Sequence, residues 1–339
     1  MNRLAEARGL SRREMQQGDP LVDWWHPVAW AHDVGVTPFG TVLLGRTLVV
    51  WRDEDGIAHC FRDLCQHRGT ALSLGTIDKS TLVCAYHGWA YAADGRCVRI
   101  PQLPADKAIP AGARALSFRC EERHGLIWVC LGEPTSPIPD FPEYTMPGFR
   151  HAPCPAYTWR TSAPRMVENF TDFGHLAWLH DGLLGNKDDP IVPPHEVDRV
   201  GNELHYSLTM QVPAADGVND LAGDTGLMTN TYVLSLPHAI WLKSTYHDTG
   251  KSRVLFFAVQ PLNADMSQGF CYQSRDFDLD GDDAPYVKFQ EVLAEQDRPV
   301  VESQRPEELP LDLGDELHMK FDKVAVEYRK ALTSLGLLS

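Results

Sequence analysis

The chain has 339 residues, of which 43% are hydrophobic, and this is enough apolar material for one large core or two ordinary ones; we expect two domains. Acidic residues outnumber basic residues 46 to 31, and the net charge of −15 argues against nucleic acid or an anionic membrane surface as a partner. The N-terminal stretch is polar, and no run of about 18 apolar residues occurs. We therefore expect a globular protein of the cytoplasm, whose eight scattered cysteines are thiols or metal ligands.

The first part of the folded chain is expected to be all-β. Short β-branched runs alternate with turn signals from residue 40 onward, and two of these turns, Asp55-Gly56 and Asp94-Gly95, are typical of hairpins. The strands expected around them are residues 47–51 with 60–61 and residues 90–92 with 97–100, and a later strand is expected over residues 125–130.

Residues 132–142 contain four prolines and cannot form regular structure, so the domain boundary is expected there. We assign a polar tail to residues 1–22, the β domain to residues 23–135 and a second domain to residues 136–339. The second domain is expected to be α+β. Its expected strands are residues 231–244 and 252–260, and its expected helices are residues 165–180, 284–304 and 319–335.

Two short loops of the β domain each supply one cysteine and one histidine, Cys65-Gln66-His67 and Cys84-Ala85-Tyr86-His87. Glycine follows each loop and allows a sharp turn. Two cysteines and two histidines also suit a structural zinc ion, but zinc sites usually pair like ligands in one loop. The mixed loops favour a 2Fe–2S cluster in which Cys65 and Cys84 bind one iron and His67 and His87 bind the other.

A second metal site is expected in the aromatic run of residues 169–180, which contains Asp172, His175 and His180. Two imidazoles and one carboxylate that leave positions open on an iron ion form the arrangement that activates O₂. On an ideal helix His175 and His180 point about 140° apart, so we expect a frayed helix end or a π-type turn to bring them together. Asp172 lies one helical turn from His175 and is itself a candidate ligand.

Helical spacing selects the third ligand. Asp297 lies on one stripe with Phe289, Leu293 and Val300, and a carboxylate on an apolar face is costly unless it is paired or binds a metal. A capping role before Pro299 is the alternative. The other charged residues of this helix, Glu291, Glu295, Arg298 and Glu302, share a different face on which they can be solvated.

With these motifs, the sequence resembles the oxygenase components of the Rieske non-heme iron oxygenases over nearly its whole length. Its length is similar to that of the homotrimeric hydroxylases and O- or N-demethylases. The resemblance implies a Rieske 2Fe–2S domain followed by a helix-grip-like α+β domain with mononuclear Fe(II). It also implies O₂ as co-substrate, electrons from NAD(P)H through a separate reductase with or without a ferredoxin, and a small aromatic or heterocyclic substrate.

The resemblance gives Asp172 a different role from that of a ligand. It implies that this carboxylate links a cluster histidine, His87 of one subunit, to His175 of the next, and carries the electron between the two centres. Asn169 is expected near the open iron positions, with a helix N-cap as the alternative. Four residues on the covering strands are candidate pocket residues, with a satisfied core or surface role as the alternative that is favoured for each: Asn230, Tyr232, His238 and Trp241.

Two other functions fit parts of the pattern. A ring cis-dihydroxylating dioxygenase would use the same metal ligands. A non-catalytic Rieske electron carrier, or a zinc-stabilised binding protein, would have no use for His175, His180 and Asp297.

Overall fold

The computed structural model describes residues 19–212, 222–223 and 226–337, and the chain divides into two compact units between Ile138 and Pro139. That division falls within the proline-rich segment 132–142. Of the expected polar tail, residues 1–18 lie outside the described residues, and Pro20–Asp23 forms a 3-10 helix, η1. None of the described helices is both long enough and apolar enough to cross a membrane.

The first unit is all-β, as predicted, and both expected hairpins are confirmed. β3 (Arg46–Arg52) pairs with β4 (Ala58–Arg62), and Gly56 in the turn has φ 80°. The turn before β8 (Cys97–Arg99) uses Gly95 at φ 85°, a left-handed conformation that favours glycine. Six strands form one antiparallel sheet in the order β1 (His26–Trp30), β10 (Leu126–Cys130), β9 (Ser117–Arg123), β4, β3, β2 (Phe39–Leu43), and four form another, β5 (Thr76–Asp78), β6 (Thr81–Val83), β7 (Ala90–Ala92), β8 (Cys97–Arg99).

The second unit is α+β and is organised around one antiparallel sheet. The expected strand over residues 252–260 is confirmed within β17 (Ser252–Asn263), but residues 231–244 do not form one strand. They belong to β15 (Leu227–Ser235) and β16 (Ala239–Tyr246), because the chain reverses at Leu236-Pro237-His238. The sheet order is β11 (Arg150–Pro153), β18 (Met266–Arg275), β17, β16, β15, β14 (Glu203–Gln211), β13 (Val197–Val200), and β12 (Tyr157–Trp159) pairs with β18.

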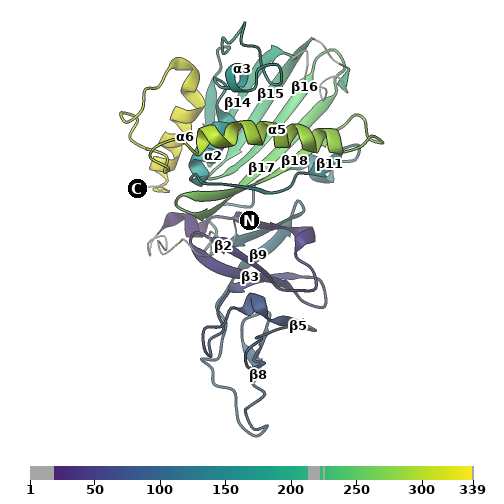
Figure 1. Ribbon diagram of the computed structural model, residues 1–339, viewed down its shortest axis with the longest axis vertical. Helices are drawn as coiled ribbons and strands as arrows, with labels where there is room; N and C mark the ends of the chain where they lie inside the picture. The colour runs from purple at the N-terminus through teal and green to yellow at the C-terminus, as the bar shows by residue number, and fades with distance from the viewer. Residues whose placement is uncertain (1–18, 213–221, 224–225, 338–339) are drawn as a thin grey trace. The chain divides into compact units, whose positions relative to one another are not determined.

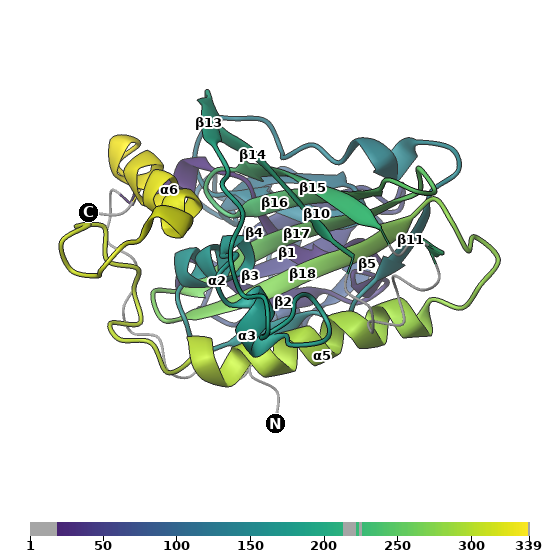
Figure 2. The same ribbon diagram turned by 90° about the horizontal axis from the view of Figure 1, so that it is seen from above.

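One long helix, α5 (Ala284–Val301), lies across one face of this sheet, as Figures 1 and 2 show. It carries Phe289, Leu293 and Asp297 on its buried side, as the stripe predicted. Val300 was expected on that stripe but is 47% exposed, because the buried side of the helix continues instead through Val301, four residues after Asp297. The remaining helices are α2 (Ala163–Thr171), α3 (Leu176–Leu179), α6 (Lys323–Ser334) and the 3-10 helices η2 (Ala31–Asp33), η3 (Leu72–Leu74), η4 (Pro142–Thr145) and η5 (Lys320–Asp322).

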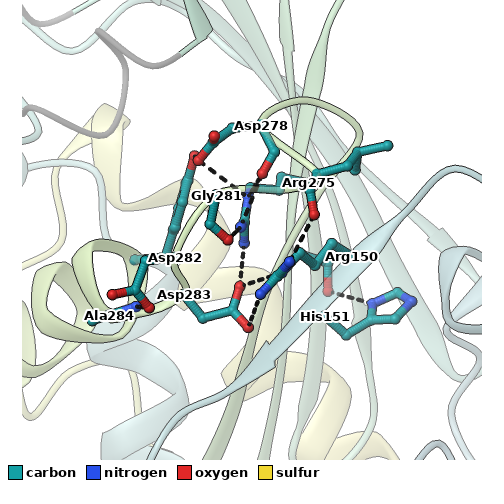
Figure 3. Close-up of polar contacts among 11 residues, drawn as sticks. Arg150, His151, Arg275, Asp278, Gly281, Asp282, Asp283 and Ala284 are labelled. Carbon is teal, nitrogen blue, oxygen red and sulfur yellow. Dashed lines mark hydrogen bonds and ion pairs between the residues drawn. The ribbon is translucent and has the colours of Figure 1, made fainter.

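The N-terminus of α5 is fixed to the sheet through Asp283 (Figure 3). Arg150 of β11 and Arg275 of β18 both donate to this carboxylate, at 2.7 and 2.8 Å. Burial raises the pKa of Asp283, but the two guanidinium groups outweigh burial and hold it below its ordinary value. The Arg275 guanidinium also lies 3.9 Å from the centroid of the Tyr286 ring on the first turns of α5. These contacts position the helix that carries Asp297.

A buried ion network joins α2 to α6. Arg329 of α6 donates to Glu168 of α2 at 2.8 and 3.0 Å and also pairs with Glu316. Burial raises the pKa of Glu168, and the charge of Arg329 offsets part of that rise. The network holds α2, whose last turn leads into the expected metal site.

Arg329→Met is expected to lower the free energy of unfolding of this unit by about 3–5 kcal/mol, because it leaves Glu168 buried without its main partner. Lys330→Met is the matched control. Lys330 is exposed and pairs with Glu327 on the same helix, so its loss is expected to cost less than about 1 kcal/mol. Chemical denaturation followed by tryptophan fluorescence measures both, and equal costs would contradict a structural role for the buried network.

Candidate metal centres

The two cysteine–histidine loops have the same backbone structure. In each, the cysteine N–H donates to a carbonyl five residues later, Thr70 or Trp89, and the glycine four residues later donates back to the cysteine carbonyl. Both glycines, Gly69 and Gly88, have φ near 70°, a left-handed conformation that costs other residues free energy. The paired loops lie after β4 and between β6 and β7.

This backbone brings the four expected side chains together. The Cys65 and Cys84 thiols are buried, and the His67 and His87 rings lie 4.5 Å apart between centroids. Within the described part of the chain, the buried Nδ1 of His67 has no hydrogen-bond partner. Desolvation and the neighbouring His87 and Arg68 lower the pKa of His67, which favours the neutral imidazole that binds metal. An unsatisfied buried imidazole nitrogen beside two buried thiols fits a 2Fe–2S cluster.

Two aromatic residues that the motif did not predict complete this site. The Trp89 ring stacks on His67, with 4.6 Å between centroids and planes 5° apart. The Tyr91 hydroxyl lies 3.1 Å from the Cys65 sulfur. Both follow Cys84 closely along the chain, so a search for hydrogen-bond donors near the ligands in sequence would have found Tyr91.

Tyr91→Phe is expected to leave the cluster in place and to lower its reduction potential, because a hydrogen bond to a ligand sulfur stabilises the more negative, reduced state. A bond worth about 0.5–1.5 kcal/mol corresponds to roughly 20–60 mV for one electron. Spectroelectrochemical titration of the visible absorbance measures the shift. Tyr86→Phe changes an exposed hydroxyl in the neighbouring loop and serves as the control. An unchanged potential in Tyr91→Phe would mean that its hydroxyl does not act on the sulfur.

The second site forms where α2 ends. The expected helix over residues 165–180 is wrong in its middle: α2 ends at Thr171, and Asp172 adopts an extended backbone with ψ 129°. Its carboxylate then accepts from the backbone N–H of Gly174 and of His175, at 2.9 and 3.1 Å, and competes with helical hydrogen bonds. The chain therefore turns before His175, and the short helix α3 that follows has His175 as its N-cap and His180, with the non-helical backbone φ −105° and ψ 38°, as its C-cap. The expected helix end is found at His180, whereas the described residues of this segment contain no π turn.

This local backbone brings together the three expected ligands, His175, His180 and Asp297, whose ligand atoms all lie within 4.8 Å of one another. The Nε2 atoms of the two histidines lie 3.7 and 3.1 Å from the same oxygen of Asp297. Burial lowers the pKa of His180, but the bond and charge of Asp297 outweigh it and raise the pKa. Asp297 is buried, as its place on the apolar stripe predicted.

Both histidines are oriented by a partner on the nitrogen that faces away from the site. Asp172 Oδ2 lies 2.9 Å from His175 Nδ1, and Gln296 Oε1 lies 2.7 Å from His180 Nδ1. An acceptor at Nδ1 places the proton there and leaves the Nε2 lone pair free for a metal. The donor set of two imidazoles and one carboxylate therefore fits an Fe(II) ion with open positions. Sequence reasoning missed Gln296, although it directly precedes Asp297.

Asp172 is hydrogen-bonded to the candidate ligand His175, and it is not one of the three groups that converge on the expected metal position. Burial raises the pKa of its carboxyl, but the bonds from His175 and Gly174 outweigh burial and lower the pKa. Asn169 lies at the site, with Nδ2 3.4 Å from Asp297 Oδ1. The alternative role of Asn169 as a helix N-cap is wrong, because Ser162 caps α2.

The four candidate pocket residues do not lie together. Asn230 and Tyr232 are two residues apart on β15 and share the sheet face that α5 covers. The Tyr232 ring lies 5.5 Å from that of Phe173, next to Asp172. Trp241 lies on the opposite face and donates to the buried Glu143 at 2.8 Å, which contradicts its assignment to a pocket near the iron. His238 is buried in the turn between β15 and β16.

A groove of about 720 Å³ lies beside the segment that contains Asp172 and His175. Asp172 and His175 line it, together with the apolar side chains of Ile191, Leu317 and Phe321. Ile191 is 77% exposed and Leu317 is 89% exposed, so this edge presents apolar surface to solvent. Phe321 belongs to the expected helix over residues 319–335, but it lies in the 3-10 helix η5, before α6 begins.

An all-β unit with paired cysteine–histidine loops, followed by an α+β unit with a two-histidine, one-carboxylate site, defines a class of two-centre iron oxygenases. Family comparison gives the same class. Residues 24–117 match the Rieske 2Fe-2S domain, and residues 159–337 match the Vanillate O-demethylase oxygenase C-terminal domain. The chain belongs to the oxygenase components of the Rieske non-heme iron oxygenases, as the resemblance implied. It is therefore an enzyme, and the electron-carrier and zinc-protein alternatives are wrong.

Individual relatives extend over nearly the whole chain. Methylxanthine N1-demethylase NdmA of Pseudomonas putida is 34% identical over 328 residues, which cover 93% of this chain and 89% of the relative. Methylxanthine N3-demethylase NdmB of the same organism is 31% identical and covers 94% and 90%. The solved structure of Pseudomonas putida CBB5 NdmA with caffeine superimposes with a TM-score of 0.82 at 32% identity and covers 92% and 90% of the two chains.

Proposed function

We propose that this chain is the terminal oxygenase of an oxidative demethylase that removes a methyl group, most directly an N-methyl group, from a small heterocyclic or aromatic substrate. The convergence of His175, His180 and Asp297 beside the sheet face covered by α5 carries the proposal. Two relatives that extend over nearly the whole chain are N-demethylases by name, which favours demethylation over ring dihydroxylation.

The reaction consumes one O₂ and two electrons for each methyl group. The substrate R–N–CH₃, O₂, NADH and a proton give R–N–H, formaldehyde, NAD⁺ and water. Cys65, Cys84, His67 and His87 would hold the 2Fe–2S cluster, and His175, His180 and Asp297 would hold Fe(II). When bound, the two centres supply one-electron transfer and O₂ activation.

The remaining residues orient these ligands. The Asp172 carboxylate accepts a hydrogen bond from Nδ1–H of His175, and the Gln296 side-chain oxygen accepts one from Nδ1–H of His180. Both imidazoles are therefore fixed in the tautomer whose Nε2 can bind a metal. Asn169 donates to Asp297 and fixes one carboxylate oxygen. The rings of Tyr206 and Tyr232 stack on each other, and Phe173 contacts both edge-on, so buried aromatic rings flank this side of the site.

We further propose that the protein is a homotrimer and works in the cytoplasm with a separate NAD(P)H-dependent reductase, with or without a ferredoxin. The groove along Asp172 and His175 would receive the cluster-binding loops of a second copy. Asp172 would then accept from His87 of the partner subunit as well as from its own His175. The apolar rim of Ile191 and Leu317 supports this assignment, because it would be covered in the assembly.

A reconstituted assay tests the demethylase proposal. Holoenzyme, a reductase, NADH and O₂ are incubated with N-methylated and methoxylated aromatic and heterocyclic compounds and with unsubstituted ones. We expect loss of a methylene by mass and about one formaldehyde for each NADH oxidised with a true substrate. Gain of two oxygens without formaldehyde would make the protein a dihydroxylase and overturn the proposal.

A further inference from the structure

Four arginines of the second unit are buried, and one of them differs from the other three. Arg165, Arg275 and Arg329 each pair with a carboxylate, at 2.9 Å, 2.8 Å and 2.8 Å. Arg253 of β17 is only 4% exposed, yet none of the carboxylates in the described ranges lies within ion-pair distance of it. Its buried Nε and Nη1 atoms also have no hydrogen-bond partner among those residues. A buried cation with unsatisfied donors is costly unless a ligand compensates it.

The Arg253 side chain lies between the sheet and α5. Its guanidinium carbon is 5.3 Å from the centroid of the Phe289 ring, which projects from the buried side of α5. In the sheet, Arg253 lies directly opposite Ser244 of β16, and Ser244 lies opposite Asn230 of β15. Directly paired residues share one face of a sheet, so Arg253 lies on the same face as Asn230 and Tyr232, the face that α5 covers. The Phe289 ring interacts with the cation but offers no acceptor to its N–H groups, so Nε and Nη1 stay without a hydrogen-bond partner among the described residues.

A second unsatisfied group lies on the same face. Gln273 of β18 pairs with Leu255, two residues from Arg253. Its Nε2 donates to Gln290 of α5 at 2.9 Å, while its buried Oε1 has no partner among the described side chains and backbone groups. Orphaned donors and an orphaned acceptor, all buried under one helix, are typical of a polar binding site that awaits its ligand.

The spacing along α5 relates this position to the metal site. Phe289 and Asp297 lie on one stripe of the helix, eight residues apart, which corresponds to about 12 Å along the axis. A molecule of one or two rings can therefore contact Arg253 with one end and present a methyl group at His175, His180 and Asp297 with the other.

We propose that Arg253 binds a carboxylate on the substrate, so that the enzyme demethylates an N-methyl or methoxy aromatic or heterocyclic acid. A carboxylate accepts two parallel N–H bonds from a guanidinium and also neutralises its charge, whereas a neutral carbonyl accepts the bonds and leaves the buried charge uncompensated. This inference rests on the proposed function and names its substrate class.

Binding to the holoenzyme tests the inference separately from turnover. The probes are 3-(methylamino)benzoate and 4-methoxybenzoate, each compared with its carboxamide, and dissociation constants come from ligand-dependent shifts of the thermal midpoint. Arg253→Met removes the charge at similar length, and Arg253→Lys keeps the charge but loses the planar fork. Lys243→Met is the matched control, because Lys243 lies on the opposite face of the same sheet, beside Glu143.

We expect the wild type to bind the carboxylates at least tenfold more tightly than the carboxamides. Arg253→Met should weaken carboxylate binding by about 10- to 100-fold, Arg253→Lys by less, and Lys243→Met not at all. The inference is overturned if no carboxylate binds, if carboxamides bind equally well, or if the preference persists in Arg253→Met. Formaldehyde release from a neutral N-methyl heterocycle with any of these results would leave the demethylase proposal standing, so the two failures are distinguishable.

Discussion

Asp172→Asn is expected to reduce turnover by about 100-fold or more while both metal centres stay loaded. The Asp172 carboxylate accepts from the backbone N–H groups of Gly174 and His175 and from His175 Nδ1. An asparagine has one oxygen, so its NH₂ group would face a donor, either on His175 or on His87 of the partner subunit. The variant keeps the size of the side chain but loses the link proposed between the cluster of one subunit and the iron of the next.

Three measurements separate this outcome from simple unfolding or metal loss. Iron and sulfide analysis should match wild type, the cluster should still be reduced by the reductase, and reoxidation by O₂ with substrate present should slow. Asp181→Asn is the control, because Asp181 lies in the same segment but is exposed and pairs with Lys187. Normal reoxidation in Asp172→Asn would rule out the linking role.

The sequence motifs predicted most of the side chains that the structure brings together at the two sites, because all of these except Asp297 lie close to one another in sequence. Cys65 with His67 and Cys84 with His87 lie in loops whose glycines need a left-handed backbone, and this requirement is visible in the sequence. Asp297 lies far from His175 and His180 in sequence, but burial of a carboxylate on an apolar helical stripe selected it.

Strand register is where prediction from the sequence failed. Side chains alternate between the faces of a sheet, so one undetected turn decides which residues share a face. Residues 231–244 were expected to be a single strand, and the reversal at Leu236-Pro237 breaks it. Asn230 and Tyr232 precede the reversal and lie under α5, whereas Trp241 follows it and lies on the other face.

Arg253 shows a second limit. Every residue of β17 is buried, so no alternation of polar and apolar positions marks the functional face. An arginine in such a strand is unusual, but only the structure shows that Arg275 has a carboxylate partner and that, among the described residues, Arg253 does not. Gln296 and Tyr91 were missed because they act through hydrogen bonds to candidate ligands, and the spacing of the ligands themselves does not reveal such bonds. Both residues are near a candidate ligand in sequence, so a search for polar neighbours of the ligands would have included them.

Asp297→Ala is expected to remove the mononuclear iron, leave the cluster intact and abolish formaldehyde release. Two histidines without the carboxylate provide less charge and one ligand fewer, so Fe(II) should no longer be retained. Iron should fall from about three to about two per chain while sulfide stays at about two, and the visible cluster spectrum should not change. Glu295→Ala is the control, because Glu295 is exposed on the same helix and pairs with Arg298.

An Asp297→Ala variant that keeps about three irons per chain would show that Asp297 is not a ligand. A variant that loses the cluster as well would show that the substitution disturbs the fold. Retention of iron in Glu295→Ala together with its loss in Asp297→Ala would assign the third ligand to the buried face of α5.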